Sequence, residues 1–369
     1  MRASGDVCIR EGLADILLPS FEPSRGPKKR EMVFYNSAME LSRDISVAVL
    51  NALAGERWKV LDGLGASGVR GIRFALEVSK DIKITINDLS SPAIAYIQKN
   101  AELNGVDVTI SKKNLNALLG EERFDYIDID PYGTPVPFLS SALQSLRPSG
   151  VLGITATDTA VLFGTKPKTC LRRYHSRIVK VPFYKEVGVR VLLGYIARVA
   201  AGYDLAMEPL LSYTTNHYIR VYVRIRKGAK RADTSLTQVQ NFEYRAEDMW
   251  RELSPSGRYG PLWGGELHDT RLLSKLRTEE HFGAKNRFEK FLLLWKEEVG
   301  SSPLFYTVDE FAARLKVPPP RLVTLLQMLK DMGEKASRTH FSPKGFHTTA
   351  HPKTIEEAFR CCISSKNAS

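Results

Sequence analysis

One short segment of the sequence combines an acidic residue, a proline and an aromatic residue in an order that could do chemistry. Asp130, Pro131 and Tyr132 directly follow Phe124–Ile129, a run of the kind that forms a buried strand. A carboxylate and a loop carbonyl can accept the two N–H bonds of an exocyclic amine while an aromatic ring stacks on the base. This chemistry suits amino-group methylation. A strand that ends in an ordinary turn explains the same residues, because Asp-Pro and Tyr-Gly are common turn dipeptides.

The strand expected at Phe124–Ile129 determines how these side chains are positioned. Ile127 and Ile129 lie on one face at period two, so Asp128 and Asp130 share the other face near the carboxyl end. In an open α/β sheet, ligands bind at the carboxyl ends of the strands. We therefore expect Asp130 to lie in an active site, with the Pro131 carbonyl beside it.

A glycine-rich loop follows the strand expected at Trp58–Asp62 and leads into a helix. Glycines allow the backbone to approach a ligand closely, and N–H groups at a helix start favour a carboxylate or a phosphate. The next strand, Ile82–Ile86, ends at Asn87-Asp88, and an acid in that place typically accepts the ribose hydroxyls of an adenosyl ligand. The residues expected to form this cofactor pocket are Asp62, Gly63, Gly65, Ser67, Arg70 and Asp88.

The alternation of strands and helices predicts the fold class. Further strands are expected at Val106–Ser111, Phe124–Ile129 and Gly150–Thr155, which makes five β–α steps in a row. Such a series predicts a parallel, doubly wound α/β sheet. A helix over Val187–Ala201 and alternating strands around Tyr213–Ile225 are expected to complete the sheet.

We expect two domains, because 369 residues exceed one ordinary domain. The composition becomes polar from Lys227 to about Tyr259, and we interpret this stretch as a connector. The expected domains are residues 1–232, an α/β domain with an N-terminal extension, and residues 233–369, a smaller α+β domain.

The second domain carries three local signals. Thr307-x-x-Glu310 predicts a capped helix, Pro320 opens another helix, and Arg338–Thr349 alternates like a hairpin. Two short helices and a hairpin resemble a winged helix. That motif can bind nucleic acid or simply pack, and the sequence leaves both readings open.

The balance of charge indicates the kind of partner. Lys and Arg number 53 against 41 Asp and Glu, which gives a net charge of +12 and a pI of about 9.4. This charge suits a polyanion, with nucleic acid first and a membrane surface second. The four cysteines have no Cys-x-x-Cys spacing and no clustered histidines beside them, so neither a disulfide framework nor a zinc site is expected.

The start of the chain carries acidic and basic residues, which excludes a secretory segment, and no apolar run approaches the roughly 20 residues of a membrane span. We expect a soluble, cytoplasmic protein.

Two basic segments could contact RNA. Thr165–Arg190 is rich in Lys and Arg against one acid, Glu186, and it includes Arg172 and Arg173. Aromatic residues are interleaved there: Tyr174, Phe183 and Tyr184. Charge together with stacking surface fits RNA, although a solvated helix face explains the same composition. Ser24–Arg30 reads as a solvated loop or as an RNA-facing arm.

Together these segments resemble the tRNA (guanine(26)-N2)-dimethyltransferase family, in its archaeal type. The resemblance extends from Val33 to the C-terminus. It rests on ordered motifs: Val33-Phe34-Tyr35-Asn36 with Arg43-Asp44, Gly65 to Arg73, Asp128 to Gly133, Thr155 to Asp158, Glu186-Val187-Gly188, Gly260 to Trp263, and Arg338 to Pro343.

The resemblance implies a class I (Rossmann-like) methyltransferase fold, S-adenosylmethionine as methyl donor, and two successive methylations of the amino group of guanine 26 in tRNA. It implies that Arg43, Arg70 and Asp88 contact the cofactor and that Asn114-Leu115 lies beside its adenine. Phe34 precedes a helix and on local grounds reads as a hydrophobic staple.

The catalytic candidates are therefore Asp130 and Pro131, and the substrate-binding candidates are Phe34, Tyr132, Arg172 and Arg173. We expect tRNA as partner, with the C-terminal domain contributing to tRNA binding, and a monomer.

The sequence departs from the family pattern at a few places. Relatives usually have Asp-Ala where this chain has Asn114-Leu115, and an Asn oxygen can still accept from an adenine amino group. Zinc-binding cysteines that some relatives carry in the connector are absent, so we predict no metal. Three alternatives remain: amino methylation of another RNA or DNA base, an RNA-binding protein with a residual cofactor pocket, and, least supported, a dinucleotide oxidoreductase.

Overall fold

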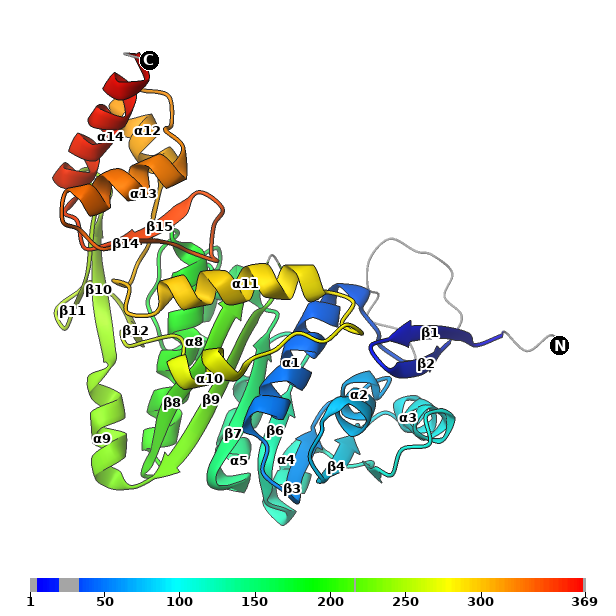
Figure 1. Cartoon of the computed structure of the whole chain (residues 1–369). Coiled ribbons are helices and arrows are strands. Elements are labelled where there is room, and N and C mark those ends of the chain that lie inside the picture. Colours follow the sequence, from blue (N-terminus) through cyan, green and yellow to red (C-terminus); the bar gives the residue numbers. More distant parts are fainter. Residues whose placement is uncertain (1–4, 20–32, 216, 368–369) are drawn as a thin grey trace. The chain divides into compact units, whose positions relative to one another are not determined.

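The structure is a computed structural model that describes residues 5–19, 33–215 and 217–367 (Figure 1). The predicted basic segment Ser24–Arg30 lies outside the described residues. The chain divides into two compact units, and each unit combines three separate stretches of sequence. Unit 1 comprises residues 1–156, 222–227 and 274–290, and unit 2 comprises residues 157–221, 228–273 and 291–369.

Unit 1 contains a parallel sheet with the strand order β5-β4-β3-β6-β7. The strands are β3 (Trp58–Asp62), β4 (Ile82–Asn87), β5 (Thr109–Ser111), β6 (Phe124–Ile129) and β7 (Leu146–Ala156). In the register, Leu61 lies opposite Thr85 on one side and Ile127 on the other. These strands confirm the predicted parallel sheet, and they place the ends of β3, β4 and β6 beside one another.

Five helices connect or precede these strands: α1 (Glu40–Leu53), α2 (Val69–Glu77), α3 (Ser91–Leu103), α4 (Leu115–Glu121) and α5 (Val136–Ser145). Helix α2 packs against both α1 and α3, and α4 packs against α5. The apolar residues of α1 that repeat every four positions, such as Leu41, Ile45 and Val49, are buried. The helices thereby cover the apolar faces of the sheet and leave the strand ends for other contacts.

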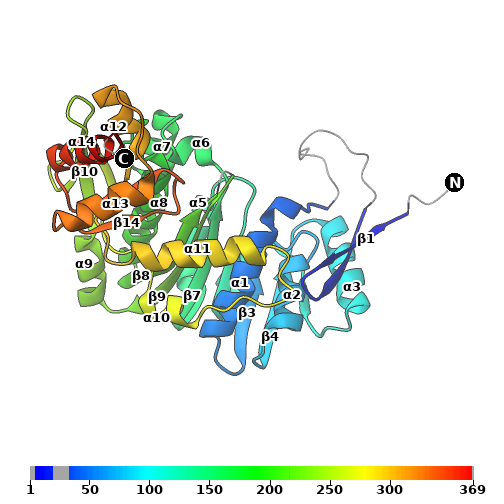
Figure 2. The same cartoon turned by 45° about the horizontal axis from the view of Figure 1, so that its top comes forward.

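An N-terminal hairpin of β1 (Val7–Glu11) and β2 (Ala14–Leu18) lies against α2 and α3 (Figures 1 and 2). Two asparagines of α3 and its C-cap hold it: the side chain of Asn100 accepts from Leu17 N at 2.7 Å, and that of Asn104 accepts from Asp15 N at 2.9 Å. The hairpin brings Glu11 next to the helices, which the sequence did not predict.

Unit 2 begins with three helices, α6 (Thr159–Leu162), α7 (Pro167–Tyr174) and α8 (Tyr184–Ala201), and continues with β8 (Leu205–Thr214) and β9 (Ile219–Lys227), of which residues 219–221 belong to this unit. Helix α8 packs against β8. The expected helix over Val187–Ala201 and the expected strands are therefore present, and the helix starts three residues earlier than predicted.

The interpretation of residues 227–259 as a polar connector is wrong. The stretch folds as α9 (Ala229–Thr237), β10 (Val239–Arg245) and β11 (Trp250–Ser254), and β10 pairs with both β11 and β12 (Tyr259–Trp263). Few apolar residues are enough here, because strand pairing satisfies the backbone and Phe242 is fully buried, while the other residues of β10 are partly or fully exposed.

The C-terminal part of unit 2 follows α10 (Thr270–Lys275) and α11 (Lys285–Glu298). It comprises β13 (Tyr306–Thr307), α12 (Val308–Leu315), α13 (Leu322–Asp331), β14 (Ala336–Arg338), β15 (Gly345–Thr348) and α14 (Pro352–Asn367). Thr307 and Glu310 form the predicted capping box, and the three strands have the order β13-β15-β14. Two helices followed by a hairpin confirm the elements expected of a winged helix.

The two compact units differ from the segments predicted as domains. A division at residue 232 assumes that each domain is continuous, whereas both units interleave along the chain. The division into residues 1–232 and 233–369 stays a prediction. Among the described residues, no helix has both the length and the apolar character that a membrane crossing requires. The four cysteines are free thiols.

Candidate active site

Arg70, in the first turn of α2, joins the two acidic residues of β6. Its Nε lies 3.3 Å from Asp128 Oδ1, and its terminal nitrogens pair with Asp130 Oδ2 and donate to Ser46 Oγ at 2.6 Å. Asp128 also accepts a hydrogen bond from the hydroxyl of Tyr126 at 2.7 Å. The two carboxylates therefore share one face of the strand, as the period-two pattern predicts.

The two carboxylates differ in their access to solvent. The side chain of Asp128 is fully buried, whereas that of Asp130 is 21% exposed. Two positions later the ring of Tyr132 is 73% exposed, and it meets the ring of Phe34 edge to face at 6.4 Å. The reading of Phe34 as a hydrophobic staple is therefore wrong, because its ring is exposed and contacts Tyr132. A carboxylate next to exposed rings is suited to bind a flat, polar group.

The glycine-rich loop is pressed against the ends of the strands. Gly63 N donates to Asp128 O at 3.0 Å, and Gly65 N donates to Asn87 O at 2.8 Å. A Cβ on Gly63 would lie 2.9 Å from Asp128 O, and one on Gly65 would lie 2.5 Å from a methyl carbon of Ile86. The loop requires glycine at these two positions because the backbones approach so closely.

Asp88 and its neighbour Asn87 hold this loop from β4. Asp88 accepts from Ala66 N at 2.9 Å through one oxygen and from Ser90 N at 2.8 Å through the other. The Asn87 amide donates to Gly63 O and Lys113 O, both at 3.1 Å. Sequence reasoning did not identify Asn87, because nothing in the sequence distinguishes an asparagine that links two loops from one in an ordinary turn.

Asp62, the last residue of β3, contacts the start of the helix that follows the loop. It is almost fully buried and accepts from Gly71 N at 3.0 Å. Burial raises the pKa of Asp62 to about 7, although the charge of Arg70 opposes this shift. The carboxyl is therefore poised between its two protonation states near neutral pH.

Ser67 tests whether this loop fits a polar ligand. It is buried in the loop, and within the described part of the chain its hydroxyl has no hydrogen-bond partner. A buried hydroxyl without a partner is costly, so a ligand oxygen or nitrogen at the loop would compensate for it. Together with the two confined glycines, Ser67 fits a cofactor that carries hydroxyl, amino and carboxylate groups.

Asn114 and Leu115 lie at the start of α4. Asn114 is the N-cap of α4, and its Oδ1 accepts from Asn116 N at 3.0 Å. Leu115 is buried, and its methyl carbons would lie 3.0 and 3.1 Å from a Cβ on Gly63. Leu115 thus borders the glycine loop, whereas the Asn114 oxygen is already used in the cap.

Arg43 lies in a different cluster. Its guanidinium pairs with Glu11 through two hydrogen bonds of 2.6 and 2.5 Å, and its side chain is buried. Arg43 and Arg73 lower the pKa of Glu11 although burial opposes this shift. The structure therefore gives Arg43 an internal partner, Glu11, which sequence reasoning missed. The cofactor contact of Arg43 stays a prediction.

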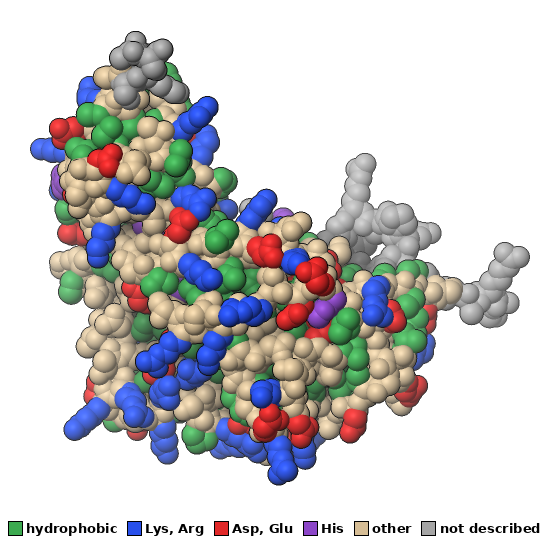
Figure 3. All heavy atoms as spheres, viewed as in Figure 1, with side chains coloured by type: hydrophobic (Ala, Val, Ile, Leu, Met, Phe, Trp, Pro, Cys, Tyr) green, Lys and Arg blue, Asp and Glu red, His purple; other side chains and the backbone are tan. Residues whose placement is uncertain are grey.

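The basic segment of unit 2 is only partly available to a ligand. Arg172 is exposed, and Arg173 pairs with Asp158 at 3.1 Å with 44% of its side chain exposed. Tyr174 and Phe183 are fully buried, and Arg190 is buried against Glu186. The expectation of stacking by these two aromatic rings is wrong, because their rings pack inside the unit. Lys and Arg side chains are spread widely over the visible surface (Figure 3).

A parallel sheet, a glycine loop after its first strand and an acid after its second fit the class I methyltransferases, which use S-adenosylmethionine. The model of the N2,N2-dimethylguanosine tRNA methyltransferase family matches residues 12–360, and the chain belongs to this family.

Relatives and a solved structure support this assignment over almost the whole chain. A tRNA (guanine(26)-N(2))-dimethyltransferase of Thermococcus kodakarensis is 38% identical and covers 96% of this chain and 99% of its own. One of Pyrobaculum aerophilum is 41% identical and covers 91% and 92%. The structure of Trm1 from Pyrococcus horikoshii with S-adenosyl-L-methionine is 35% identical, covers 95% and 99%, and has a TM-score of 0.86. The predicted family, fold class, enzyme class and methyl donor are confirmed.

Proposed function

We propose that this enzyme transfers methyl groups from S-adenosylmethionine to the exocyclic N2 of guanine 26 in tRNA, in two successive steps, with Asp130 as the catalytic residue. The observation that supports this assignment is the partly exposed carboxylate of Asp130, which is held by Arg70 next to the exposed rings of Phe34 and Tyr132.

Asp130 addresses the weak nucleophilicity of the guanine amine. The lone pair of that nitrogen is delocalised into the ring, and the nitrogen must become pyramidal before it can attack a methyl group in line. Two acceptors placed on its N–H bonds favour this geometry. Arg70 engages Oδ2 of Asp130, which leaves Oδ1 and the carbonyl of Pro131 to serve as these acceptors. Asp130 also receives the proton that the amine loses.

Phe34 and Tyr132 receive the base. Inside an RNA helix the amino group of a guanine is out of reach of an enzyme pocket, so the base must leave its stack. The two exposed rings meet edge to face, so one ring can stack on the base while the edge of the other limits its sideways movement. Aromatic stacking replaces part of the stacking energy that the base loses.

The cofactor supplies an electrophilic methyl group on its sulfonium centre. The residues that would hold it are Asp88 at the ribose hydroxyls, Ser67 and the N–H groups of the glycine loop at its amino-acid part, and Asn114 with Leu115 beside its adenine. Asp62 and Arg70 border the same loop. Arg43 would contribute to cofactor binding through its positive charge.

The exposed cations of α7, Arg172 above all, would contact the phosphates of the tRNA, and the C-terminal winged-helix elements would extend the contact. We propose that the enzyme acts on tRNA in the cytoplasm, and we expect it to act as a monomer.

Single-turnover methylation of total tRNA with labelled donor, followed by digestion to nucleosides, tests this function. Wild-type enzyme should give N2-methylguanosine and then N2,N2-dimethylguanosine. Asp130→Ala should lose at least about a hundredfold in rate while cofactor and tRNA binding persist, the usual scale for a general base. Asp130→Asn keeps one acceptor without the charge and separates the two roles.

Asp107→Asn is the matched control, because Asp107 is an exposed acid in unit 1. It should retain the wild-type rate. A near wild-type rate in Asp130→Ala would contradict the assignment and direct attention to Asp128. Label in a nucleoside other than methylated guanosine would instead favour methylation of another base.

A further inference from the structure

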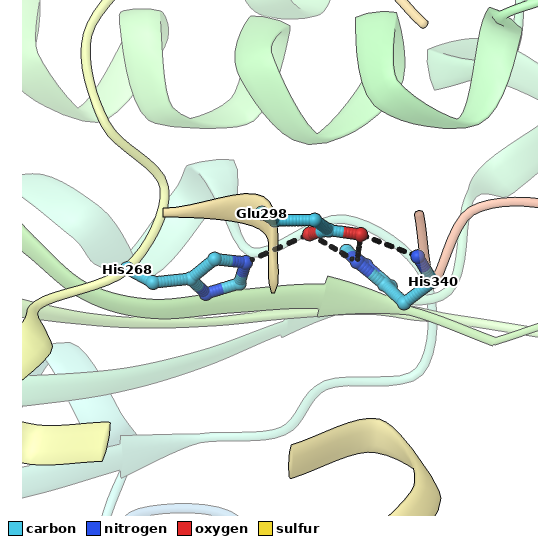
Figure 4. Close-up of side chains that lie close together, drawn as sticks. All are labelled: His268, Glu298 and His340. Carbon is cyan, nitrogen blue, oxygen red and sulfur yellow. Dashed lines mark hydrogen bonds and ion pairs between the residues drawn. The ribbon is translucent and has the colours of Figure 1, made fainter. Parts of the chain in front are cut away.

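Three polar side chains from distant parts of the sequence meet inside unit 2 (Figure 4). His268 lies between β12 and α10, Glu298 is the last residue of α11, and His340 lies between β14 and β15. One ligand atom from each lies within 4.8 Å of the others. Their side chains are 1%, 4% and 0% exposed, so the group is almost completely enclosed by protein.

Both imidazoles point a nitrogen at the same carboxylate. His268 Nε2 lies 3.0 Å from Glu298 Oε2, and His340 Nδ1 lies 2.8 Å from each of the two carboxylate oxygens. One oxygen of Glu298, His268 Nε2 and His340 Nδ1 are therefore close enough to one another to bind a single ion.

The other oxygen of Glu298 is held by a second layer of donors. Oε1 accepts from the hydroxyl of Thr339 at 2.8 Å and from the main-chain N–H of His340. These contacts fix the plane of the carboxylate, as second-layer contacts typically do in metal sites. They leave Oε2 directed at the two imidazoles.

Aromatic rings pack against both imidazoles, and burial beside them makes the charge of the carboxylate costly. The ring of Trp295 lies 6.0 Å from that of His268, and Phe291 and Phe341 lie 5.9 and 3.9 Å from the ring of His340. A buried carboxylate beside aromatic rings needs a compensating positive charge. A divalent cation held by the two imidazoles would supply it.

We propose that His268, Glu298 and His340 form a binding site for a divalent transition metal ion, with Zn²⁺ as the best fit. Two imidazoles and one carboxylate are a ligand set that Zn²⁺ uses together with a water molecule in the fourth position. Each histidine would bind as a neutral ring with its proton on the far nitrogen, His268 Nδ1 or His340 Nε2. Neither of these nitrogens has a partner among the described residues.

A cavity gives the ion and its water a route to this site. It has a volume of about 250 Å³ and is bordered by His268 and Glu298, with Glu266 and Arg190 also on its wall. The far nitrogen of His268 would donate to water there, because a ligating histidine usually donates its other N–H. The bound ion would connect the segment before α10, the end of α11 and the β14–β15 loop, and thereby fix the winged-helix elements to the rest of unit 2.

This proposal departs from the expectation of no metal, which rested on the cysteines. The three ligands are separated by 30 and 42 residues along the chain, so no motif spacing announces them. It is independent of the methylation assigned to unit 1.

Metal binding to the full-length protein tests the site, with any histidine tag removed. Elemental analysis of protein purified with Zn²⁺ should give one ion per chain. After stripping with a chelator, Co²⁺ should bind in a one-to-one ratio with the strong visible absorption of a four-coordinate ion, and Zn²⁺ should displace it. His268→Gln and His340→Gln should weaken binding by at least about a hundredfold, while His351→Gln, an exposed histidine of the same unit, should leave it unchanged.

Two results would overturn the proposal: wild-type protein that binds neither ion, which would leave a purely hydrogen-bonded network, or binding that survives both glutamine variants. If these variants do not fold, X-ray absorption on wild-type protein with Zn²⁺ decides. Nitrogen and oxygen ligands with imidazole scattering support the site, and sulfur ligands place the ion at a cysteine and refute it.

Discussion

Two arginines three positions apart on α2 have opposite surroundings. Arg73 is fully buried among Glu11, Asp44 and Glu77, with nitrogen–oxygen distances of 3.0, 2.7 and 2.8 Å. Arg70 pairs with Asp128 and Asp130, and the carboxylate of Asp130 is partly open to solvent. Both clusters contain more acidic than basic groups, yet only one of them leaves a charged group accessible.

Ion pairs between arginine and carboxylates stabilise the fold around Arg73, whereas around Arg70 they leave a carboxylate that can act on a substrate. Around Arg73 every carboxylate has an internal partner, including a hydrogen bond from Ala284 N to Asp44 at 2.9 Å. Around Arg70 one oxygen of Asp130 remains for a ligand, and exposed rings lie two residues further along. We expect changes at the first cluster to lower stability and changes at the second to lower activity.

The largest effect is expected from Arg73→Met. The substitution leaves three buried carboxylates without their shared cation, and breaking a buried ion pair typically costs about 3–5 kcal/mol. The midpoint of thermal unfolding, followed by circular dichroism, measures the loss. Arg70→Met should lower the midpoint less, because it leaves one fully buried carboxylate, Asp128, without this cation, whereas Asp130 can turn to water. Equal losses in the two variants would contradict the comparison.

Asp62, whose pKa is affected by Arg70 and its two partner carboxylates, should make the free energy of unfolding depend on pH. Its folded pKa of about 7 lies above the ordinary value of 3.8, so the folded state binds the proton more tightly. The stability from this proton is complete below about pH 4 and is lost as the pH rises through 7. The shift corresponds to at most on the order of 4 kcal/mol, since one pKa unit is about 1.4 kcal/mol.

Asp62→Asn keeps an acceptor for Gly71 N and removes the ionisation. The variant should therefore be more stable than wild type at pH 8, and the two should converge near pH 4. Chemical denaturation at a series of pH values measures the gap. A gap that does not change with pH would show that Asp62 is ionised throughout.

Removal of the exposed rings should weaken the binding of the tRNA substrate rather than the stability of the fold. Tyr132→Ala and Phe34→Ala each lose one stacking partner, worth about 1–3 kcal/mol per base. KM for tRNA or the single-turnover rate should change by roughly ten- to a hundredfold, with the unfolding midpoint unchanged, because both rings are exposed. Tyr132→Phe, which keeps the ring, should behave like wild type. A lowered midpoint without a loss of activity would assign the rings to packing.

The smallest effect per residue is expected from Arg172→Glu. Each phosphate contact contributes a slope of about one to the dependence of log K on log salt. Arg172 is a clean position because its only described contact is a 3.4 Å hydrogen bond to Thr169 Oγ1, whereas Arg173 pairs with Asp158. Filter binding of tRNA at several salt concentrations should show a flatter slope than wild type. Lys80→Glu in unit 1, as control, should leave it unchanged.

Local signals in the sequence predict part of the geometry that the structure shows. Period two in β6 predicts that Asp128 and Asp130 share one face, which is confirmed, and the glycine loop followed by Asp88 predicts a cofactor site, which stays a prediction. Both patterns lie within a few residues, where backbone geometry alone determines direction. The capping box of Thr307 and Glu310 is of the same kind.

Partners that are distant in sequence could not be found in this way. Glu11 reaches Arg43 only because the hairpin packs on α2 and α3, and Asn87 links two loops whose approach depends on the whole sheet. The strands β10 and β11 also escaped prediction, since their stability comes from pairing and from one buried phenylalanine rather than from an apolar run.

The order in which the chain leaves the ribosome matters for a unit built from three stretches. Residues 274–290 supply Ala284 N to Asp44, and His281 lies 3.1 Å from Glu77. A nascent chain of 230 residues already contains the glycine loop and Asp130 but lacks these contacts with Asp44 and Glu77. Unit 1 should thus mature only after most of the protein has been synthesised, and a ribosome stalled before residue 274 should carry a protease-sensitive methyltransferase fold.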